Sequence, residues 1–332
     1  MIRGTKIEHK WTIIVLLAVL LFSLGGPQSS VSAAPSTAAS DVTIVLNGKE
    51  VRLDDPVRIQ DNRMYVPAGR IAAQLGASVS WNSDNEELTI ESALKDTIVF
   101  GNGVPVVYFN DVRYRMDALP FTEGGRLYVP VRTLAEVLHA QLQYNTDSSV
   151  VSIASVDPAV ITDTYTIEQA AKDNTISKAA LLNRNGLNSK SKINEGTKLR
   201  VVRPAFMDQP AASYTKADLI LLAKITTVEA GYESYEGQLA VANVILNRVK
   251  SGRFPNSIHD VIYSGRQFPP AHDGTLDKVE PKESALRAAK DALNGKNNVE
   301  DAVYFFNPDV TSGPFWSSLD VVVSIGHHSF AK

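Results

Sequence analysis

The chain has 332 residues and a formal net charge of −3, with 33 lysines and arginines against 36 aspartates and glutamates. The basic residues are scattered, so the charge pattern gives no indication of nucleic-acid binding. The complete lack of cysteine excludes disulfides, thiol catalysis and thiolate metal sites, and leaves stability to packed cores, of which this length allows two or three.

Residues 1–33 are typical of a secretory signal peptide. Basic residues precede an apolar run from Trp11 to Leu24, and small residues then lead to a cleavage site near Ala33. The apolar run is shorter than the ~20 residues that a membrane-spanning helix needs, which favours cleavage over a single-pass anchor. We therefore expect a secreted protein of the cell wall or extracellular space, possessing no stable membrane span once the leader is removed.

Residues 41–156 contain an internal repeat with an offset of 63 positions, so that Trp81 corresponds to Tyr144. Each copy predicts strands, a short helix and a closing hairpin, which together make a β-rich α+β tandem repeat. The matching Val-Pro motifs are Val66-Pro67 and Val129-Pro130, and the matching hairpin turns are Asn47-Gly48 and Asn110-Asp111. The pair resembles the domain named after the N-terminal region of copper amine oxidases. A copper site requires several imidazoles, and His139 has no histidine partner here, so we expect a structural or wall-contacting module.

Residues 160–203 predict a small βααβ module. The expected elements are a strand at Thr164–Thr166, helices at Ile167–Lys172 and Lys178–Arg184, and a strand at Thr197–Val202. Asn185-Gly186-Leu187 and Ile193–Leu199 resemble the closing half of a LysM module, which implies binding to N-acetylglucosamine in peptidoglycan. The opening Thr162–Tyr165 departs from that pattern, so a connector without a ligand is the alternative. Residues 204–213, which contain two prolines, predict a linker.

The stretch from Asp218 to Lys250 predicts two helices joined by a short polar elbow at Gly231. A carboxylate at the C-terminal end of a helix lies at the negative end of the backbone dipole, which disfavours its ionisation. Apolar packing raises the pKa further, toward the range of a general acid. Glu229 is therefore the candidate acid among the three carboxylates around the elbow, Glu229, Glu233 and Glu236.

The remainder of the C-terminal domain, residues 214–332, is predicted to be mainly α-helical with a small β element. The expected elements are helices at Ile258–Tyr263 and Lys282–Asn294, loops at Gly265–Gly274 and Ser312–Trp316, an extended segment at Tyr304–Phe306, and a strand or hairpin from Val321 to Phe330.

Several motifs of this domain resemble the spore cortex-lytic type of bacterial cell-wall hydrolase. They occur in the order Glu229-Ala230, Glu233-Ser234-Tyr235-Glu236-Gly237-Gln238, Asn247-Arg248-Val249, Tyr304–Pro308 and Ile325–Phe330. The resemblance implies a fold akin to lysozymes and lytic transglycosylases, and peptidoglycan glycan strands as the partner. It also implies cleavage between N-acetylmuramic acid (MurNAc) and N-acetylglucosamine (GlcNAc) by one glutamate, which maps onto Glu229, with no cofactor. Gly231-Tyr232 departs from the Arg-Gly that the family more often has, which removes a possible cation partner of the acid.

Further candidate residues would contact the substrate. Glu233 would share a face with Glu229 if the helix continued, and would then hold it protonated or act as a second carboxylate. Amides and aromatic rings suit N-acetyl sugars, whose faces pack on rings. These candidates are Glu233, Gln267, Phe268, Tyr304, Asn307, Trp316 and His328. Core packing is the alternative for Tyr304 and is favoured for Phe305 and Phe306.

Two other functions stay open. A zinc-dependent peptidoglycan amidase needs histidines around an open metal position, but the histidines that follow the leader show neither His-x3-His nor His-Glu-x-x-His spacing; they are His139, His259, His272, His327 and His328. We expect the last two to point to opposite faces of one strand. A non-catalytic wall-binding scaffold would fit the degraded LysM opening and Ala331, where the family has an aromatic residue. The choice between vegetative wall and spore cortex, and the oligomeric state, are left open.

Overall fold

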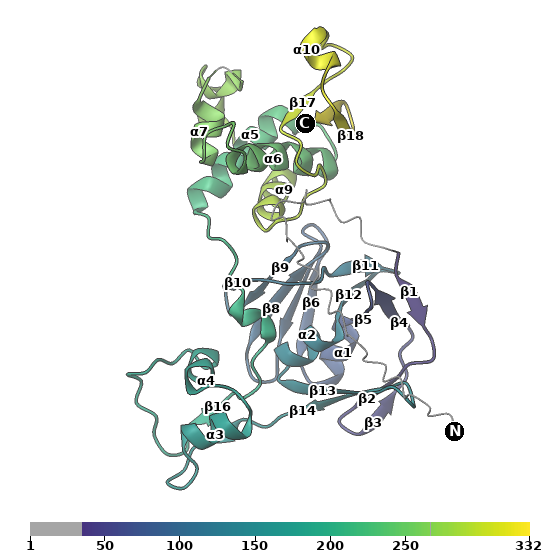
Figure 1. Cartoon of the computed structure of the whole chain (residues 1–332), viewed down its shortest axis with the longest axis vertical. Coiled ribbons are helices and arrows are strands. Elements are labelled where there is room, and N and C mark those ends of the chain that lie inside the picture. Colours follow the sequence, from purple (N-terminus) through teal and green to yellow (C-terminus); the bar gives the residue numbers. More distant parts are fainter. Residues whose placement is uncertain (1–34, 266) are drawn as a thin grey trace, which may run out of the picture.

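The protein is described here by a computed structural model covering residues 35–265 and 267–332, so the predicted signal peptide lies outside the described residues. A β-rich N-terminal domain, a small module of two helices and a mainly helical C-terminal domain follow one another along the chain (Figure 1). Within those residues, no helix combines the length and the apolar character that crossing a membrane requires.

The N-terminal domain repeats one pattern of strands around one short helix. The first copy comprises β2 (Thr43–Leu46), β3 (Lys49–Val51), β4 (Val57–Gln60), β5 (Arg63–Pro67), α1 (Ala68–Gln74), β6 (Ser78–Asn82) and β7 (Glu87–Glu91). The second comprises β9 (Val106–Phe109), β10 (Val112–Arg115), β11 (Phe121–Glu123), β12 (Arg126–Pro130), α2 (Val131–Val137), β13 (Ala140–Asn145) and β14 (Val150–Ser155). β1 (Thr37–Ala39) precedes the first copy, and β8 (Thr97–Gly101) connects the two. The helices α1 and α2, like the strands β5 and β12, lie 63 positions apart.

The β2–β3 and β9–β10 hairpins close through the same kind of turn. Asn47 and Gly48 have φ angles of 48° and 77°, and Asn110 and Asp111 have φ angles of 50° and 65°. Two consecutive positive φ angles make a type I′ turn, whose twist matches that of the flanking strands. The two hairpins predicted from these dipeptides are therefore confirmed.

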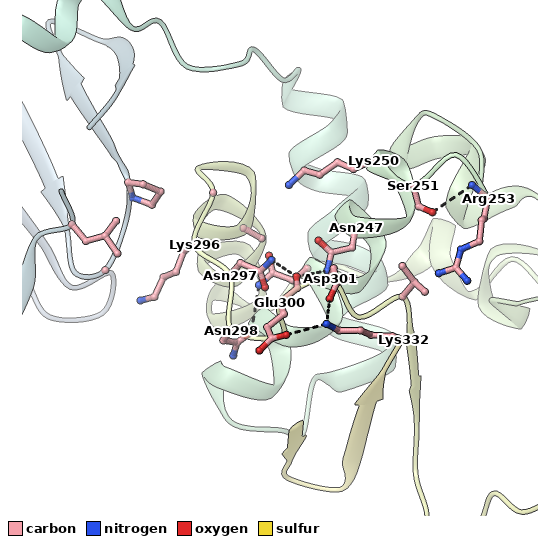
Figure 2. Close-up of a pocket in the computed structure, with 17 residues that line it drawn as sticks. Asn247, Lys250, Ser251, Arg253, Lys296, Asn297, Asn298, Glu300, Asp301 and Lys332 are labelled. Carbon is pink, nitrogen blue, oxygen red and sulfur yellow. Dashed lines mark hydrogen bonds and ion pairs between the residues drawn. The ribbon is translucent and has the colours of Figure 1, made fainter. Parts of the chain in front are cut away.

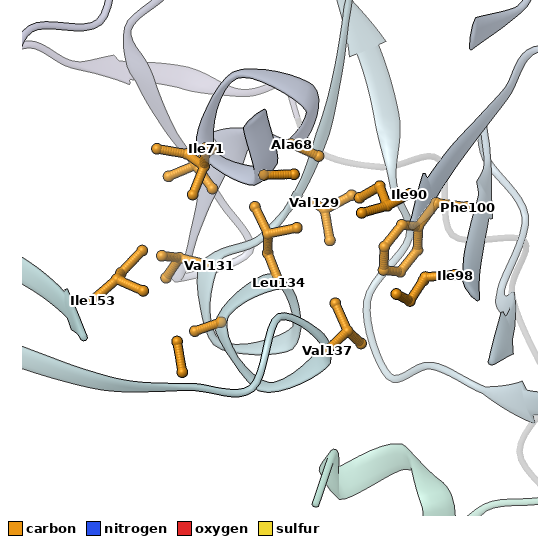
Figure 3. Close-up of a cluster of buried hydrophobic side chains, with 14 of the residues drawn as sticks. Ala68, Ile71, Ile90, Ile98, Phe100, Val129, Val131, Leu134, Val137 and Ile153 are labelled. Carbon is orange, nitrogen blue, oxygen red and sulfur yellow. The ribbon is translucent and has the colours of Figure 1, made fainter. Parts of the chain in front are cut away.

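The two copies interlock through strand pairing and share one core. β5 pairs with β12 antiparallel in the sheet β1-β4-β5-β12-β11, while β2 pairs with β14 in parallel in the sheet β13-β14-β2-β3. The third sheet has the order β10-β9-β8-β7-β6. Ile71 of α1 and Leu134 of α2 are fully buried between these sheets, together with Val129 and Phe100 (Figure 3). Each copy thus completes the apolar core of the other.

The middle module has the predicted strand–helix–helix–strand order, but its first strand lies earlier than expected. β15 (Ala159–Val160) pairs antiparallel with β16 (Lys198–Leu199), and α3 (Ile167–Asp173) and α4 (Lys178–Arg184) lie between them. The segment Thr164–Thr166 is not a strand, because threonine side chains bind its backbone. The Thr162 hydroxyl accepts from Tyr165 N at 2.9 Å, and the Thr166 side chain caps α3. Such local bonds compete with ladder formation.

A buried ion pair joins the middle module to the N-terminal domain. Arg184 of α4 and Asp96 are both fully buried and lie 2.6 Å apart, and Arg200 approaches the same carboxylate at 3.6 Å. Burial opposes ionisation of Asp96, but hydrogen bonds from Arg184 and Asn110 outweigh it and lower the pKa of this carboxyl. The two bodies are therefore packed together by a desolvated charge pair.

His139 contributes to the same junction. Its side chain is buried, Nδ1 lies 2.7 Å from Val156 O, and Nε2 accepts from the backbone N–H groups of Val201 and Val202 at 2.8 and 3.0 Å. Burial lowers its pKa, so the ring is neutral and donates through Nδ1. Both ring nitrogens are engaged by backbone groups, which makes His139 a structural residue of the junction.

The predicted linker, residues 204–213, is folded against the N-terminal domain. It contains the 3-10 helix η1 (Ala205–Asp208), and Phe206 is buried against Tyr114, with ring centroids 5.5 Å apart. Arg115 N donates to Gln209 O at 2.8 Å, and Ala211 N donates to Arg113 O at 3.0 Å, so the segment follows β10. The segment predicted as a linker thus runs along the edge of β10, because its prolines exclude a regular helix but not packing against a strand edge.

The C-terminal domain is mainly helical, as predicted. Its helices are α5 (Lys216–Ala230), α6 (Tyr235–Lys250), α7 (Ile258–Tyr263), η2 (Pro269–Ala271), α8 (Thr275–Lys278), α9 (Glu283–Leu293) and α10 (Pro314–Ser317). The strands β17 (Tyr304–Phe306), β18 (Val321–Ile325) and β19 (His328–Ala331) form an antiparallel sheet in the order β17-β19-β18. Helices α5, α6 and α9 pack around one apolar cluster, and a second cluster joins α6 to the sheet. The predicted loop at Ser312–Trp316 includes the start of α10.

Candidate active site

Side-chain caps mark the start of α5 and the start of α6, and the elbow lies between these two helices. At the start of α5, Thr215 Oγ1 accepts from Asp218 N at 3.0 Å and Asp218 Oδ2 accepts from Thr215 N at 2.9 Å, which makes a capping box. The helix ends at Ala230, and α6 begins after Ser234, whose hydroxyl caps its first turn. Residues 231–234 are the elbow, where the sequence predicts it.

Glu229 lies on the last turn of α5, where the two apolar clusters of the domain meet. Val228 packs against the cluster of α5, α6 and α9, while Ala230 is buried in the cluster that joins α6 to the sheet. Burial raises the pKa of the Glu229 carboxyl, and the positive charge of Arg248 opposes this without cancelling it. Among the described residues, none forms a hydrogen bond with this carboxyl. A partly buried acid without a fixed partner can transfer its proton to a ligand.

Arg248 is the functional candidate that sequence reasoning missed. It is buried on α6, its Nε donates to Val303 O at 2.7 Å, and its guanidinium lies over the rings of Phe254 and Phe268 at 5.2 and 5.5 Å. Burial lowers its pKa to about 10, and the charge of Glu229 acts in the opposite direction. Arg248 thus provides a cation near Glu229, although the dipeptide Gly231-Tyr232 has no arginine where the resembled family more often has one. Its signal in the sequence is an arginine within the apolar stripe of α6.

Glu233 belongs to the elbow rather than to the face of α5 that bears Glu229, because α5 ends at Ala230. Its side chain is only 10% exposed; it accepts from Nδ1 of His327 at 2.8 Å, and Nδ1 of His328 lies 3.8 Å away. Burial opposes its ionisation, but hydrogen bonds from the side chain and backbone of His327, together with the charge of that histidine, lower its pKa. The pKa values of the two glutamates therefore move in opposite directions.

His327 and His328 do not point to opposite faces of one strand, as the sequence suggested. β19 begins at His328, and His327 lies in the preceding turn with Gly326, whose φ is 59°. A Cβ atom at Gly326 would overlap the Glu233 carboxylate, so the close approach of turn and elbow requires glycine. The turn brings both histidines to Glu233.

Gln267 and Phe268 differ in their exposure. Gln267 is exposed, whereas Phe268 is 1% exposed and stacks on Phe305 in the core, with ring centroids 6.5 Å apart. The structure corrects the expectation that the Phe268 ring contacts a sugar, because core residues and the Arg248 guanidinium cover it. The sequence of this proline-containing loop does not by itself show that Gln267 faces solvent while the next residue, Phe268, is buried in the core.

Four aromatic side chains, Tyr304, Phe306, Phe315 and Trp316, form what we call the aromatic platform. Tyr304 meets Phe315 at 5.6 Å between ring centroids, and Trp316 meets both Phe315 and Phe306 at 5.1 Å. Side chains alternate along β17, which separates Tyr304 and Phe306 from Phe305, whose ring packs in the core. Phe315 is 52% exposed. Phe306 is partly buried and packs on Trp316 rather than in the apolar clusters that hold Phe305, and Phe315 was not singled out.

Asn307 and His328 are the last two residues that were predicted to contact the substrate. Asn307 follows β17, and its Oδ1 accepts from Asp309 N at 2.9 Å, which orders the loop toward α10. His328 is 16% exposed, and its ring meets that of Phe305 edge-on at 5.6 Å. Burial lowers the pKa of His328, which favours the neutral imidazole.

A groove of about 870 Å³ lies between the N-terminal and C-terminal domains (Figure 2). Asn247 and Lys250 of α6 line it, together with Lys296 and Lys332 (Figure 2). The Asn247 amide donates to the backbone oxygens of Glu300 and Ala302 at 2.8 and 3.0 Å, so this group holds the loop before β17. Glu229 does not line the groove.

The histidines do not assemble a zinc site in the described part of the chain. His259 stacks on Tyr263, and His272 meets the edge of the same ring. His327 and His328 both lie beside Glu233. Across residues 35–265 and 267–332, no three histidine, aspartate or glutamate side chains are grouped as a ligand set would be. The donor arrangement that a zinc amidase requires is therefore not found in these residues.

Comparison with known proteins divides the chain in the same way as the fold. Residues 232–331 match the family described as Cell Wall Hydrolase, and residues 42–153 match the family described as Copper amine oxidase N-terminal domain. Glu229 lies just before the first of these ranges.

The curated relatives are similar to the C-terminal part. The spore cortex-lytic enzyme of Bacillus subtilis (strain 168) is 40% identical over 119 residues, which are 36% of this chain and 39% of that protein. The enzyme of the same name from Oceanobacillus iheyensis is 42% identical over 120 residues, which are 36% of this chain and 43% of that protein. The chain thus spans less than half the length of these relatives.

Among solved structures, the catalytic domain of the Bacillus cereus SleB protein is 39% identical; the match covers 36% of this chain and 93% of that one, with a TM-score of 0.35. The residue ranges of these sequence matches agree with the boundaries of the folded domains. The chain therefore carries a copper amine oxidase N-terminal domain followed, in its C-terminal part, by a cell wall hydrolase domain.

Proposed function

We propose that this chain is a secreted enzyme that cleaves the MurNAc–GlcNAc bond of peptidoglycan as a lytic transglycosylase, with Glu229 as both acid and base. The observation that carries the proposal is the position of Glu229 on the last turn of α5 between two apolar clusters, where burial raises its pKa, whereas the pKa of Glu233 is lowered. Environments that separate the pKa values of neighbouring carboxyls are typical of acid–base catalysis. The name of the curated relatives, spore cortex-lytic enzyme, makes spore cortex a candidate substrate.

In the proposed reaction, the protonated Glu229 carboxyl donates its proton to the glycosidic oxygen as the bond from MurNAc C1 to that oxygen breaks. The resulting carboxylate then accepts the proton of the MurNAc C6 hydroxyl while O6 bonds to C1. The products are a free GlcNAc 4-hydroxyl end and a 1,6-anhydro-MurNAc end, and no water is consumed. The charge of Arg248 stabilises the carboxylate between the two steps.

The remaining groups would bind and position the glycan. The aromatic platform offers partly exposed rings on which sugar faces can pack, and the exposed Gln267 amide and Asn307 suit N-acetyl groups. His328, with its neutral ring, would contact the substrate near Phe305. Glu233 would support the elbow through His327, since its carboxylate is already engaged. We assign wall contact to the LysM-like module, residues 160–203, and to the N-terminal repeat, and export to the predicted signal peptide.

The test is product analysis by mass spectrometry after digestion of vegetative peptidoglycan and of spore cortex. Wild type and the control Glu236→Gln, changed at an exposed glutamate of α6, should release anhydro-muropeptides. Glu229→Gln should release them at least ~100-fold more slowly, the usual weight of a general acid. Free reducing ends would indicate hydrolysis instead. Chelator-sensitive release of stem peptides would indicate an amidase, and binding without release would indicate a scaffold.

A further inference from the structure

Arg113 of β10 holds the C-terminal end of α9. Its Nε and Nη2 donate to Asn294 Oδ1 at 3.0 and 2.7 Å, and Nη2 also donates to Leu293 O at 3.2 Å. Nη1 donates to Ala212 O at 2.7 Å, and the guanidinium lies 4.2 Å from the centre of the Tyr214 ring. A cation is favoured at the negative end of a helix dipole. One arginine of the N-terminal domain therefore joins both α9 and the entry to α5.

Ion pairs extend this contact along α9, which lies on the side of the helical domain nearest the N-terminal domain (Figure 1). Lys290 Nζ lies 2.6 Å from Glu87 Oε1, with side chains 29% and 15% exposed. Arg287 Nη2 lies 3.1 Å from Glu86 Oε2, and its Nη1 donates to Asp84 O at 2.9 Å. The acidic start of β7 thus faces a basic surface of α9, and partial burial limits the screening of these pairs.

Arg287 and its neighbours continue the contact to the elbow. Arg287 Nε lies 3.7 Å from Asp291 Oδ2, one turn further along α9, and Asp291 is 3% exposed. The same carboxylate accepts from the Tyr235 hydroxyl at 2.5 Å, and the Arg287 guanidinium lies 4.0 Å from the centre of the Tyr235 ring. Tyr235 is the first residue of α6. A continuous series of contacts therefore runs from the N-terminal domain to the end of the elbow that follows Glu229.

We propose that the N-terminal domain is a structural part of the catalytic unit: Arg113, Glu86 and Glu87 fix α9, and α9 positions the elbow through Arg287, Asp291 and Tyr235. The segment 204–213 follows β10 and leaves little slack between the domains, which keeps the two surfaces at high effective concentration. A catalytic group must be held by a rigid surround. These residues act as positioning residues and do not touch the substrate. Their effect on catalysis rests on the function proposed above, whereas the docking and the order of the elbow do not.

The experiment uses the full chain and compares hydrogen exchange with kinetics. The variants are Arg113→Ala, Glu87→Lys, Lys290→Glu, the charge swap Glu87→Lys with Lys290→Glu, and Tyr235→Phe. Arg115→Ala is the matched control, because it changes an exposed arginine of the same strand. The single variants should raise backbone exchange in α9 and in residues 231–238, the charge swap should restore protection, and Arg115→Ala should match wild type.

Tyr235→Phe separates positioning from misfolding, because it removes one hydroxyl and leaves the interface intact. It should raise exchange in residues 231–238 while β7 stays protected. In the glycan assay, the single variants should lower kcat by roughly tenfold or more at unchanged KM, since small displacements of catalytic groups have large effects on rate, and the swap should recover it. Unchanged exchange of the elbow in Arg113→Ala, or a loosened elbow with wild-type kcat, would overturn the proposal. An inactive wild type would refute the proposed function, and the exchange data alone would then decide the positioning of the elbow.

Discussion

Nδ1 of His327 lies 2.8 Å from the Glu233 carboxylate, and this contact ties the turn between β18 and β19 to the elbow between α5 and α6. The two residues are 94 positions apart in the sequence. The contact lowers the pKa of Glu233, whereas burial raises the pKa of Glu229, four positions earlier in the sequence. The two glutamates of the motif therefore have different tasks, one available to a ligand and one engaged within the fold.

The first prediction concerns stability and pH. The pKa of Glu233 is lower in the folded protein than its ordinary value of 4.5. Its ionised form thus stabilises the fold above that value, and the contribution is lost as the pH falls through the folded pKa. Glu233→Gln should lower the free energy of unfolding by about 2 kcal/mol at neutral pH and have little effect at about pH 3. Urea unfolding at both pH values measures this, with Glu236→Gln as the control. Equal destabilisation at both would contradict it.

The second prediction concerns the pH dependence of activity. Glu229 acts as a general acid only while protonated, so the rate should fall as the pH rises through its raised pKa. The charge of Arg248 lowers that pKa, so Arg248→Gln should move the fall in rate to higher pH. Arg248→Lys keeps the charge and should retain the wild-type profile. Both variants lose the bond to Val303 O, so their difference isolates the charge. A shift to lower pH in Arg248→Gln would refute the assignment of Glu229.

The third prediction concerns the aromatic platform. Removal of a ring on which a sugar packs should weaken binding without changing the chemical step. We expect Trp316→Ala to raise KM by about tenfold with kcat near that of wild type. Steady-state kinetics on soluble glycan fragments measures both constants, and Tyr144→Ala, at a half-exposed ring of the N-terminal domain, is the control. A fall in kcat at constant KM would show that the platform has another role.

The fourth prediction concerns the junction of the middle module. Arg184→Ala leaves the Asp96 carboxylate buried without its main partner, which should cost about 3–5 kcal/mol of stability. Lys178→Ala removes an ion pair with Glu168 whose side chains are 51% and 61% exposed, and should cost far less stability because solvent screens that pair. Chemical unfolding of the full chain compares the two. Similar values for both would show that the Asp96 pair is not desolvated in solution.

Local patterns predicted much of the backbone. The apolar periodicity on either side of Gly231 predicted α5, the elbow and α6, because a helix shows its buried face every 3.6 residues. Dipeptides at Asn47 and Asn110 predicted two hairpins, because these residue types tolerate the positive φ that the turns need. The predicted position of the first strand of the middle module was wrong, because the threonine side chains there bind the local backbone instead of leaving it free to pair with another strand.

The candidate site was only partly predictable for a different reason. Glu229 could be proposed from its place at a helix end and from the motif around it. The proximity of Arg248, the burial of Phe268 and the engagement of Glu233 by His327 each depend on which distant segment covers a given face. Periodicity shows that a face is covered, but not what covers it.

The sequence by itself determined where helices, turns and the repeat lie, and which glutamate stands at a helix end, because these depend on residues within a few positions of one another. Only the tertiary structure decided that the segment 204–213 packs along β10, that the N-terminal domain holds α9 of the C-terminal domain, and that the pKa values of Glu229 and Glu233 move in opposite directions. Desolvation and charge pairing depend on atoms brought together from distant parts of the chain, so these properties arise only when the cores have packed.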